Sequence, residues 1–333
     1  MKIYQTNTLI IGAGSAGCVL ANRLSKDPAR EVVLLEAGGR DNWHWIHIPV
    51  GYLYTMGNRK TDWCYQTTPQ TGLNGRQLNY PRGRVLGGSS SINGMIYMRG
   101  QAEDYDEWGA GWSWHDVLPY YKRSECYHRG SDDYHSDKGE LKVQSQRLKW
   151  SILETFKSVC EDSGFEDCPD FNKGDNSGIG YFEVNQNRGR RLSSAGAFLH
   201  PITHRSNLKV FTHATTEELL FEGASCVGAR TTIEGKPAII RADRVILAAG
   251  AIGTPAILER SGIGRESILQ KHGIPVRTCL PGVGENLQDH LQIRLQYQLA
   301  SGDTLNQRTN SWLGRIRMIL EYAFNRSGPL SMA

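Results

Sequence analysis

A glycine-rich hexapeptide near the start of the chain constrains the fold more than any other feature. The sequence Gly-Ala-Gly-Ser-Ala-Gly occupies residues 12–17, after the apolar run 8–11 and before a stretch with apolar residues at helical spacing. This order predicts a strand, a tight turn and a helix. Gly12 permits the turn, Gly14 lets backbone N–H groups approach phosphates, and Gly17 lets the helix pack on the strand. Because a helix N-terminus offers unpaired N–H donors and partial positive charge, we expect a bound pyrophosphate here.

An acidic residue completes this pattern. A second apolar run, residues 31–35, ends at Glu36. Dinucleotide-binding βαβ units place a carboxylate about 20 positions after the glycines, where it bonds the ribose hydroxyls. A carboxylate would repel a 2′-phosphate, so NADP is the least favoured dinucleotide. FAD and NAD share the adenosine and the pyrophosphate, so these residues leave both open.

The composition is that of a packed globular protein. The chain has 333 residues, 39% of them hydrophobic, enough for two domains or for one large domain with an insertion. The net charge is only +4 and no block of like charges appears, so the sequence predicts neither a nucleic-acid groove nor a polybasic membrane patch. No apolar run approaches the roughly 20 residues that span a bilayer, which predicts no transmembrane segment and leaves peripheral membrane contact open.

The N-terminus and the cysteines indicate a compartment. The first strand is expected from residue 8, which leaves no room for a signal peptide. The seven cysteines are odd in number, scattered and without a CxxC pair, which suits a reducing environment. We therefore expect a cytoplasmic protein, with attachment to a membrane surface left open.

A second glycine-rich stretch lies at residues 81–94. It has too many small residues for a stable helix interior and too many glycines for an ordinary strand. Flexible linkers lack the apolar residues that punctuate this stretch and its continuation, namely Val85, Leu86, Ile92, Met95 and Ile96. We therefore interpret it as backbone that lies flat against a ligand.

At this point the chain resembles a known family, the glucose–methanol–choline (GMC) oxidoreductases, which are FAD-dependent alcohol dehydrogenases and oxidases. Residues 83–93, Gly-Arg-Val-Leu-Gly-Gly-Ser-Ser-Ser-Ile-Asn, resemble the family's first signature, and residues 250–264 resemble its second. The hexapeptide together with Glu-Ala-Gly-Gly at 36–39 resembles its opening. Residues 281–290 resemble its Pro-Gly-Val-Gly-x-Asn-Leu-Gln-Asp-His block. The four blocks lie in family order, so the resemblance covers nearly the whole chain.

The resemblance implies FAD as the cofactor and a set of residues that bind it. It places Glu36 on the adenosine ribose and the backbone of Thr216 against the adenine. The pyrophosphate is assigned to Gly12, Gly14, Ser15 and Gly17. The residues expected along the flavin are Val85, Asn93, Gly94, Met95 and Ile96.

The resemblance also bears on how the flavin is attached. Some family members tether it covalently through a histidine immediately before the asparagine of the first signature. Here that position is Ile92. An apolar side chain offers no nucleophilic nitrogen, so we expect non-covalent FAD.

The fold class implied is α/β: an FAD-binding Rossmann-like domain of GMC type with a β-meander, beside an incomplete α+β substrate domain. We assign residues 1–135 and 191–290 to the FAD-binding domain. Residues 136–190 and 291–333 are assigned to part of the substrate-binding domain.

The meander itself is predicted from the residues. Short alternating runs at 208–212, 226–231 and 238–240 are separated by Gly or Pro turns, which is typical of consecutive antiparallel strands. The apolar run 244–250 predicts a further buried strand that returns the chain to the dinucleotide domain.

The expected activity is oxidation of the CH–OH group of a primary alcohol, with hydride transfer to the flavin. Such chemistry needs a base near the hydroxyl proton. In the family this base is a histidine in the C-terminal region, and the family continues well beyond the point that matches Ala333. The catalytic residue is therefore unknown, and His290 is a weak candidate that we interpret more readily as a pocket-lining residue.

The other histidines do not indicate a metal site. His200 and His204 are four residues apart, but Pro201 disfavours a regular helix and no glutamate completes a zinc motif. His44 and His47 lie among tryptophans and are interpreted as loop packing.

One residue of the sequence narrows the class of substrate that we expect. Choline-oxidising relatives have a glutamate two residues after the Asp-His pair, where this chain has Gln292. An amide solvates a quaternary ammonium less well than a carboxylate does, so we expect a neutral primary alcohol, with electrons passing to an acceptor such as a quinone. The alternatives are a catalytically silent FAD-binding fragment, a choline dehydrogenase, a hydroxynitrile-lyase-like enzyme and an NAD-dependent dehydrogenase.

Overall fold

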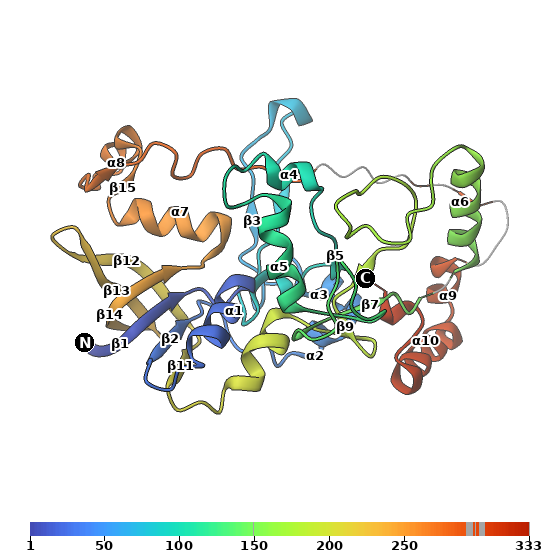
Figure 1. The fold of residues 1–333 in the computed structure, drawn as a ribbon, viewed down its shortest axis with the longest axis horizontal. Coiled ribbons are helices and arrows are strands. Elements are labelled where there is room, and N and C mark those ends of the chain that lie inside the picture. Colours follow the sequence, from blue (N-terminus) through green and yellow to red (C-terminus); the bar gives the residue numbers. More distant parts are fainter. Residues whose placement is uncertain (149, 291–295, 297, 300–303, 333) are drawn as a thin grey trace. The chain divides into compact units, whose positions relative to one another are not determined.

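The computed structural model describes residues 1–148, 150–290, 296, 298–299 and 304–332 (Figure 1). The chain forms two compact units, each assembled from separated segments. The first unit comprises Met1–Asn42, Thr55–Ile92 and Ser193–Leu295. The second comprises Trp43–Tyr54, Asn93–Leu192 and Gln296–Ala333. The segment 1–135 that we assigned to the FAD-binding domain runs past this division, because residues 93–135 contribute strands to a sheet of the second unit.

The first unit is built on a six-stranded mixed sheet. Its strands are β1 (Lys2–Ile11), β2 (Val32–Leu35), β11 (Leu208–Phe211), β12 (Ala214–Glu222), β13 (Ser225–Ile233) and β14 (Lys236–Leu247). They lie in the order β11-β2-β1-β14-β13-β12. The first three pairs in that order are parallel and the last two are antiparallel. All four residues of β2 and the last four of β1 are buried, as expected of parallel strands covered on both faces.

The register of the parallel strands brings the ends of three strands to one edge of the sheet. Ile11 pairs with Leu35 on one side and with Leu247 on the other. The next residues, Gly12, Glu36 and Ala248, therefore follow strands that end together. In open parallel sheets this carboxyl edge is where ligands bind.

The structure forms the meander from β12, β13 and β14. The predicted runs 226–231 and 238–240 lie in β13 and β14, but the first strand of the meander is β12 and not the run 208–212. The run 208–212 is instead β11, which pairs in parallel with β2 at the sheet edge. The runs 238–240 and 244–250 belong to one long strand, β14, together with its exit. The charged residues between these two runs suggested a turn in the sequence. In the structure they lie on the exposed face of β14, which is continuous through them.

Helices and short strands complete the first unit. They are α1 (Ser15–Leu24), β3 (Tyr65–Gln66), η2 (Thr71–Leu73), β4 (Asn79–Tyr80), η3 (Gly88–Ser91), η4 (Ala195–Leu199), η5 (His200–Ile202), α7 (Gly250–Arg260), β15 (Ile263–Gly264), α8 (Glu266–Lys271) and β16 (Thr278–Cys279). In the described part of the chain, no helix is long and apolar enough to cross a membrane.

The second unit contains a four-stranded sheet in the order β5-β8-β7-β6. Its strands are β5 (Ile96–Tyr97), β6 (Glu125–Tyr127), β7 (Leu141–Ser145) and β8 (Glu183–Val184), and a hairpin is formed by β9 (Gln186–Asn187) and β10 (Arg190–Arg191). The helices are α2 (His44–His47), η1 (Pro49–Gly51), α3 (Tyr52–Thr55), α4 (Ala102–Asp106), α5 (Trp114–Ser124), α6 (Ser151–Asp162), α9 (Leu305–Asn310), α10 (Trp312–Asn325) and η6 (Pro329–Ser331). Helix α5 begins at a capping box in which Ser113 and Asp116 satisfy each other's backbone N–H groups.

A buried ionic cluster of Arg99, Glu125, His135 and Asp170 lies in the core of the second unit. Nη2 of Arg99 is 2.8 Å from Oε2 of Glu125, and the side chains of both residues are at most 1% exposed. His135 is fully buried and lies between two carboxylates, with Nδ1 3.2 Å from Glu125 and Nε2 3.0 Å from Asp170. Burial lowers the pKa of His135, but its hydrogen bonds to Asp170 and Glu125 outweigh burial and raise the pKa to about 9. The cluster therefore holds an imidazolium and a guanidinium against two carboxylates.

Candidate dinucleotide-binding site

A cavity of about 790 Å³ opens at the carboxyl edge of the six-stranded sheet, entirely within the first unit. Its walls come from the turn after β1, the end of β2, the start of β12, the β14–α7 junction and the segments around β3 and η3. Of the residues predicted to bind cofactor, it is lined by Gly12, Gly14, Ser15, Glu36 and Thr216. The volume lies within the ordinary range of ligand pockets, about 300–1,000 Å³.

The three positions of the first turn are occupied by glycine for different physical reasons. Gly12 has φ of +102°, and a Cβ there would lie 2.4 Å from the carbonyl oxygen of Ala248. A Cβ at Gly17 would lie 1.9 Å from the carbonyl oxygen of Gly12. At Gly14 the nearest atom to such a Cβ is 4.0 Å away. Packing within the protein therefore requires Gly12 and Gly17, whereas Gly14 borders open space in the cavity.

Two helix N-termini meet this cavity without side-chain caps. Helix α1 begins after Gly14 and α7 after Ala249, and neither helix has an N-cap side chain bonded to it or an acidic residue in its first turn. Ser15 and Ala16 of α1 and Gly250 and Ala251 of α7 line the cavity. Unpaired N–H groups with partial positive charge favour an anionic group here. In the sequence, the second of these turns is marked by an apolar strand followed by Gly-Ala-Ile-Gly, a signal that was interpreted above only as part of a family signature.

Glu36 is fixed in the cavity wall by the backbone. The residue is 5% exposed. Its carboxylate accepts hydrogen bonds from the N–H groups of Ala13, at 3.1 Å, and Gly38, at 2.8 Å. Burial raises the pKa of Glu36 to about 7, against the opposing effect of these two N–H groups. The carboxylate can therefore titrate near neutral pH.

Thr216 lines the same cavity and carries an unsatisfied polar atom. The residue is 6% exposed, and within the described structure its buried Oγ1 has no hydrogen-bond partner. Its carbonyl oxygen accepts a bond of 3.1 Å from Nη2 of Arg260, whose Nε donates to the carbonyl of Glu217 at 2.7 Å. An orphaned buried hydroxyl is costly unless a ligand or water satisfies it.

An aromatic pair that the sequence did not predict also lines the cavity. The rings of Trp63 and Tyr65 are stacked, with centroids 5.8 Å apart and planes within 6°. The guanidinium carbon of Arg84 lies 4.9 Å from the centroid of the Trp63 ring. The pattern Trp-Cys-Tyr alternates like a strand, but nothing in it indicated which face would meet a ligand.

The remaining predicted cofactor residues do not line this cavity. Gly17 lies behind the turn, and Val85 is buried in the first unit, where it forms a backbone bridge with Gly39. Asn93, Gly94, Met95 and Ile96 belong to the second unit. Their expected placement along a flavin stays a prediction.

A buried arginine fixes the backbone at Asn93. Arg191 donates from Nη1 to Oδ1 of Asn93 at 2.9 Å, from Nη2 to the carbonyl of Asn93 at 2.6 Å, and from Nε to the carbonyl of Ile46 at 2.8 Å. Arg191 is 5% exposed, and burial lowers its pKa to about 9. The sequence offered no signal for this role, because Arg191 stands in the basic run Arg-Gly-Arg-Arg.

The histidines do not gather into a metal-binding group in the described structure. His290 is exposed, and its backbone N–H donates to Oδ1 of Asp289 at 2.8 Å. Nε2 of His200 lies 2.9 Å from Oδ1 of Asp41, and this bond raises the pKa of His200. Among the described residues, no three His, Cys, Asp or Glu side chains are grouped so that they could hold a metal. Gln292 falls outside the described residues.

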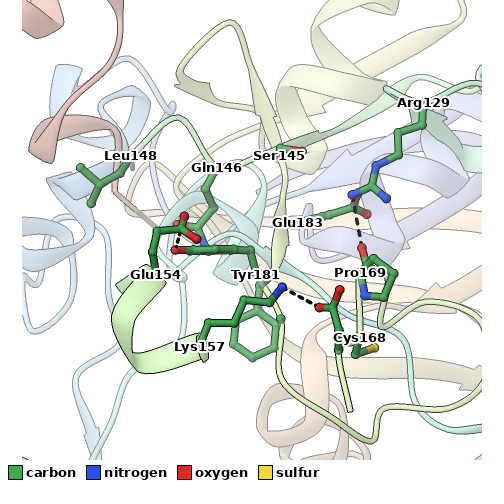
Figure 2. A pocket seen from close by; sticks show the side chains of 13 residues that line it. Arg129, Ser145, Gln146, Leu148, Glu154, Lys157, Cys168, Pro169, Tyr181 and Glu183 are labelled. Atoms are coloured by element: carbon green, nitrogen blue, oxygen red, sulfur yellow. Dashed lines mark hydrogen bonds and ion pairs between the residues drawn. The ribbon is translucent and has the colours of Figure 1, made fainter. Parts of the chain in front are cut away.

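A separate pocket of about 300 Å³ lies within the second unit (Figure 2). Its charged side chains are already paired: Lys157 with Asp167 at 2.8 Å and Arg129 with Glu183 at 3.5 Å. The Tyr181 hydroxyl donates to Glu154 at 3.0 Å. Figure 2 shows Arg129, Glu154, Lys157 and Glu183 at the pocket wall, and these charged groups already have partners within the protein.

The cavity, its two helix N-termini and its buried carboxylate are the features expected of a dinucleotide-binding α/β protein. A model of the GMC oxidoreductase family matches residues 6–292, so the chain belongs to the GMC oxidoreductases. This confirms the family resemblance and the expected α/β class.

Known relatives agree with this assignment. An oxygen-dependent choline dehydrogenase of Photobacterium profundum is 41% identical over 90% of this chain and 54% of its own length. An alcohol dehydrogenase [acceptor] of Pseudomonas putida is 39% identical over 97% of this chain and 60% of its own length. A solved FAD-dependent oxidoreductase from Chaetomium thermophilum has a TM-score of 0.90 at 27% identity, over 98% of this chain and 60% of that one. The chain therefore spans between about half and three fifths of the length of these relatives.

Proposed function

We propose that the protein binds FAD and serves in oxidation of the CH–OH group of a primary alcohol to an aldehyde, with an acceptor such as a quinone receiving the electrons. The observation that carries the cofactor proposal is the uncapped N-terminus of α1 beside Glu36 in one cavity. The similarity to a choline dehydrogenase and to an alcohol dehydrogenase supports oxidation of an alcohol. When bound, FAD supplies a two-electron acceptor for the hydride of an alcohol.

The residues present fit such a group. The N–H groups at Gly14 and Ser15 suit a pyrophosphate, and the Glu36 carboxylate suits ribose hydroxyls. Thr216 lies in the same cavity wall, where its backbone would contact the adenine. The stacked rings of Trp63 and Tyr65 offer an apolar surface for a heterocycle.

The test of this function is the visible absorption spectrum of the purified protein, followed by anaerobic addition of a primary alcohol. A flavin band that bleaches supports the proposal. A band that persists indicates a catalytically silent FAD-binding protein, and turnover of a cyanohydrin without bleaching indicates a lyase. Absence of flavin after loading with FAD contradicts the cofactor proposal itself, particularly if NAD binds instead.

Choline is the second candidate substrate, because a choline dehydrogenase is among the relatives. We favour a neutral alcohol because Gln292 stands where choline-oxidising relatives have a glutamate. The same spectroscopic assay with choline and with an uncharged alcohol of similar size separates the two. His290 is the residue to test as the base, since His290→Ala would abolish bleaching while leaving the flavin bound if it has this role.

We propose that the flavin is held without a covalent bond. Ile92 precedes Asn93 and is 1% exposed, so no histidine nitrogen stands at the family's tethering position. We expect acid denaturation to release all of the flavin into the supernatant. Flavin colour that stays with the precipitated polypeptide would contradict this prediction.

We expect FAD affinity to fall as pH drops below about 7, because burial raises the pKa of Glu36 to that value. Binding favours the carboxylate, which can accept from both ribose hydroxyls. The affinity is therefore retained above the pKa and lost below it, by up to about tenfold per pH unit. Titration followed by flavin fluorescence at several pH values measures this. Glu36→Gln should bind weakly at every pH, and an unchanged pH profile in that variant would show that another group titrates.

A further inference from the structure

Two reactive side chains lie side by side in the sheet of the second unit. Strands β6 and β7 are parallel, and their register pairs Cys126 with Lys142. Residues paired on neighbouring strands present their side chains to the same face of a sheet. The backbone therefore brings this thiol and this amine together.

The side chains are in direct contact. Nζ of Lys142 donates to Sγ of Cys126 at 2.9 Å, and Sγ lies 2.9 Å from the carbonyl oxygen of Asp137, to which the thiol donates. Both residues are half-buried, so a small oxidant can reach the sulfur from solvent. All seven cysteines are free, and Cys126 has no cysteine partner in the described structure with which to form a disulfide.

We propose that Cys126 and Lys142 form a reversible sulfenamide cross-link when the protein meets hydrogen peroxide. The thiol first loses its proton, and the thiolate sulfur attacks the peroxide O–O bond, giving a sulfenic acid and a hydroxide that takes up the released proton to become water. The sulfur thereby loses two electrons to peroxide. The uncharged Lys142 amine then attacks the sulfenic sulfur. An S–N bond forms, the S–O bond breaks, and the hydroxyl leaves as water with a proton from the nitrogen. A dithiol reductant reverses the step: one of its thiols attacks the sulfur and displaces the amine, and its second thiol then displaces Cys126, so that the thiol and amine return and the reductant becomes a cyclic disulfide.

The cross-link would close the chain segment between β6 and β7. That segment contains His135 of the buried ionic cluster. Constraining a loop in the unfolded state stabilises the native state. The site is independent of the cofactor cavity, so this proposal does not rest on the proposed function.

Peptide mapping of peroxide-treated protein by mass spectrometry tests the proposal. We expect a linked peptide pair joining Cys126 to Lys142, with the summed mass reduced by two hydrogen atoms and the link lost on treatment with dithiothreitol. The treated protein should also show a higher melting temperature that the same reductant restores to the starting value. The wild-type chain suffices for this measurement, so no variant needs to fold.

Matched controls separate a specific pair from general oxidation. Cys126→Ser should lose the cross-link and the rise in melting temperature, and Lys142→Arg, which keeps the positive charge, should instead let the sulfenic acid be trapped by dimedone. Cys226, a half-buried thiol whose sulfur contacts the carbonyl of Gly228, should give no lysine adduct. Sulfinic acid at Cys126 with a freely acylated Lys142, or a product that keeps oxygen between sulfur and nitrogen, would overturn the assignment.

Discussion

Replacing Glu125 by glutamine is expected to lower the free energy of unfolding by about 3–5 kcal/mol, the usual cost of removing one partner from a buried ion pair. Glu125 is fully buried and contacts Arg99 at 2.8 Å and His135 at 3.2 Å. It also accepts from the Tyr97 hydroxyl at 3.0 Å. The amide keeps the shape of the side chain but leaves two cations facing a neutral group. Denaturant unfolding followed by near-UV circular dichroism measures the loss.

The control is the exposed pair of Arg230 and Glu218. These side chains are 2.8 Å apart and 46% and 39% exposed. Glu218→Gln removes the same charge by the same chemistry, and we expect a change below about 1 kcal/mol because solvent screens the pair. Equal losses in the two variants would show that burial of the cluster does not set its contribution.

The glycine-rich turn after β1 could be predicted from sequence because its determinants are local. Gly12 and Gly17 are forced by backbone contacts at 2.4 and 1.9 Å within one strand–turn–helix unit and its neighbouring strand, and such contacts leave glycine at fixed spacing. Glu36 follows from the same unit, since a strand of known direction ends beside it. Most of the predicted residues that line the cavity therefore belong to this one βαβ motif.

Features built from distant segments could not be predicted in the same way. The buried ionic cluster joins residues from 99 to 170, and each of its charges resembles a solvated surface charge when considered alone. Arg191 and Asn93 are likewise 98 positions apart. The run 208–212 was wrongly assigned as the first strand of the meander, because alternation predicts that a segment is extended but not which neighbour it pairs with. Pairing depends on register and crossover, as β11 shows by joining β2 in parallel.

Replacing Gly14 by alanine is expected to weaken FAD binding by about 10- to 100-fold while leaving the fold intact. Gly14 has φ of −79°, which alanine adopts freely, and an added Cβ meets no atom closer than 4.0 Å. The methyl group would instead occupy cavity space beside the unpaired N–H groups of α1. Losing one hydrogen bond to a charged phosphate costs about 1.5–3 kcal/mol, which corresponds to this change in affinity.

Titration with FAD, followed by flavin fluorescence, measures the affinity, and unfolding of the cofactor-free protein measures the fold. Gly72→Ala is the matched control, because Gly72 lies in η2 with no atom within 4 Å of an added Cβ and outside the cavity, so neither quantity should change. Gly17→Ala should reduce stability as well as binding, because its Cβ would meet the Gly12 carbonyl at 1.9 Å. If the Gly14→Ala variant binds FAD as tightly as the unaltered chain, the pyrophosphate does not lie at the N-terminus of α1. The N-terminus of α7, which is also uncapped and lines the same cavity, would then be the alternative position.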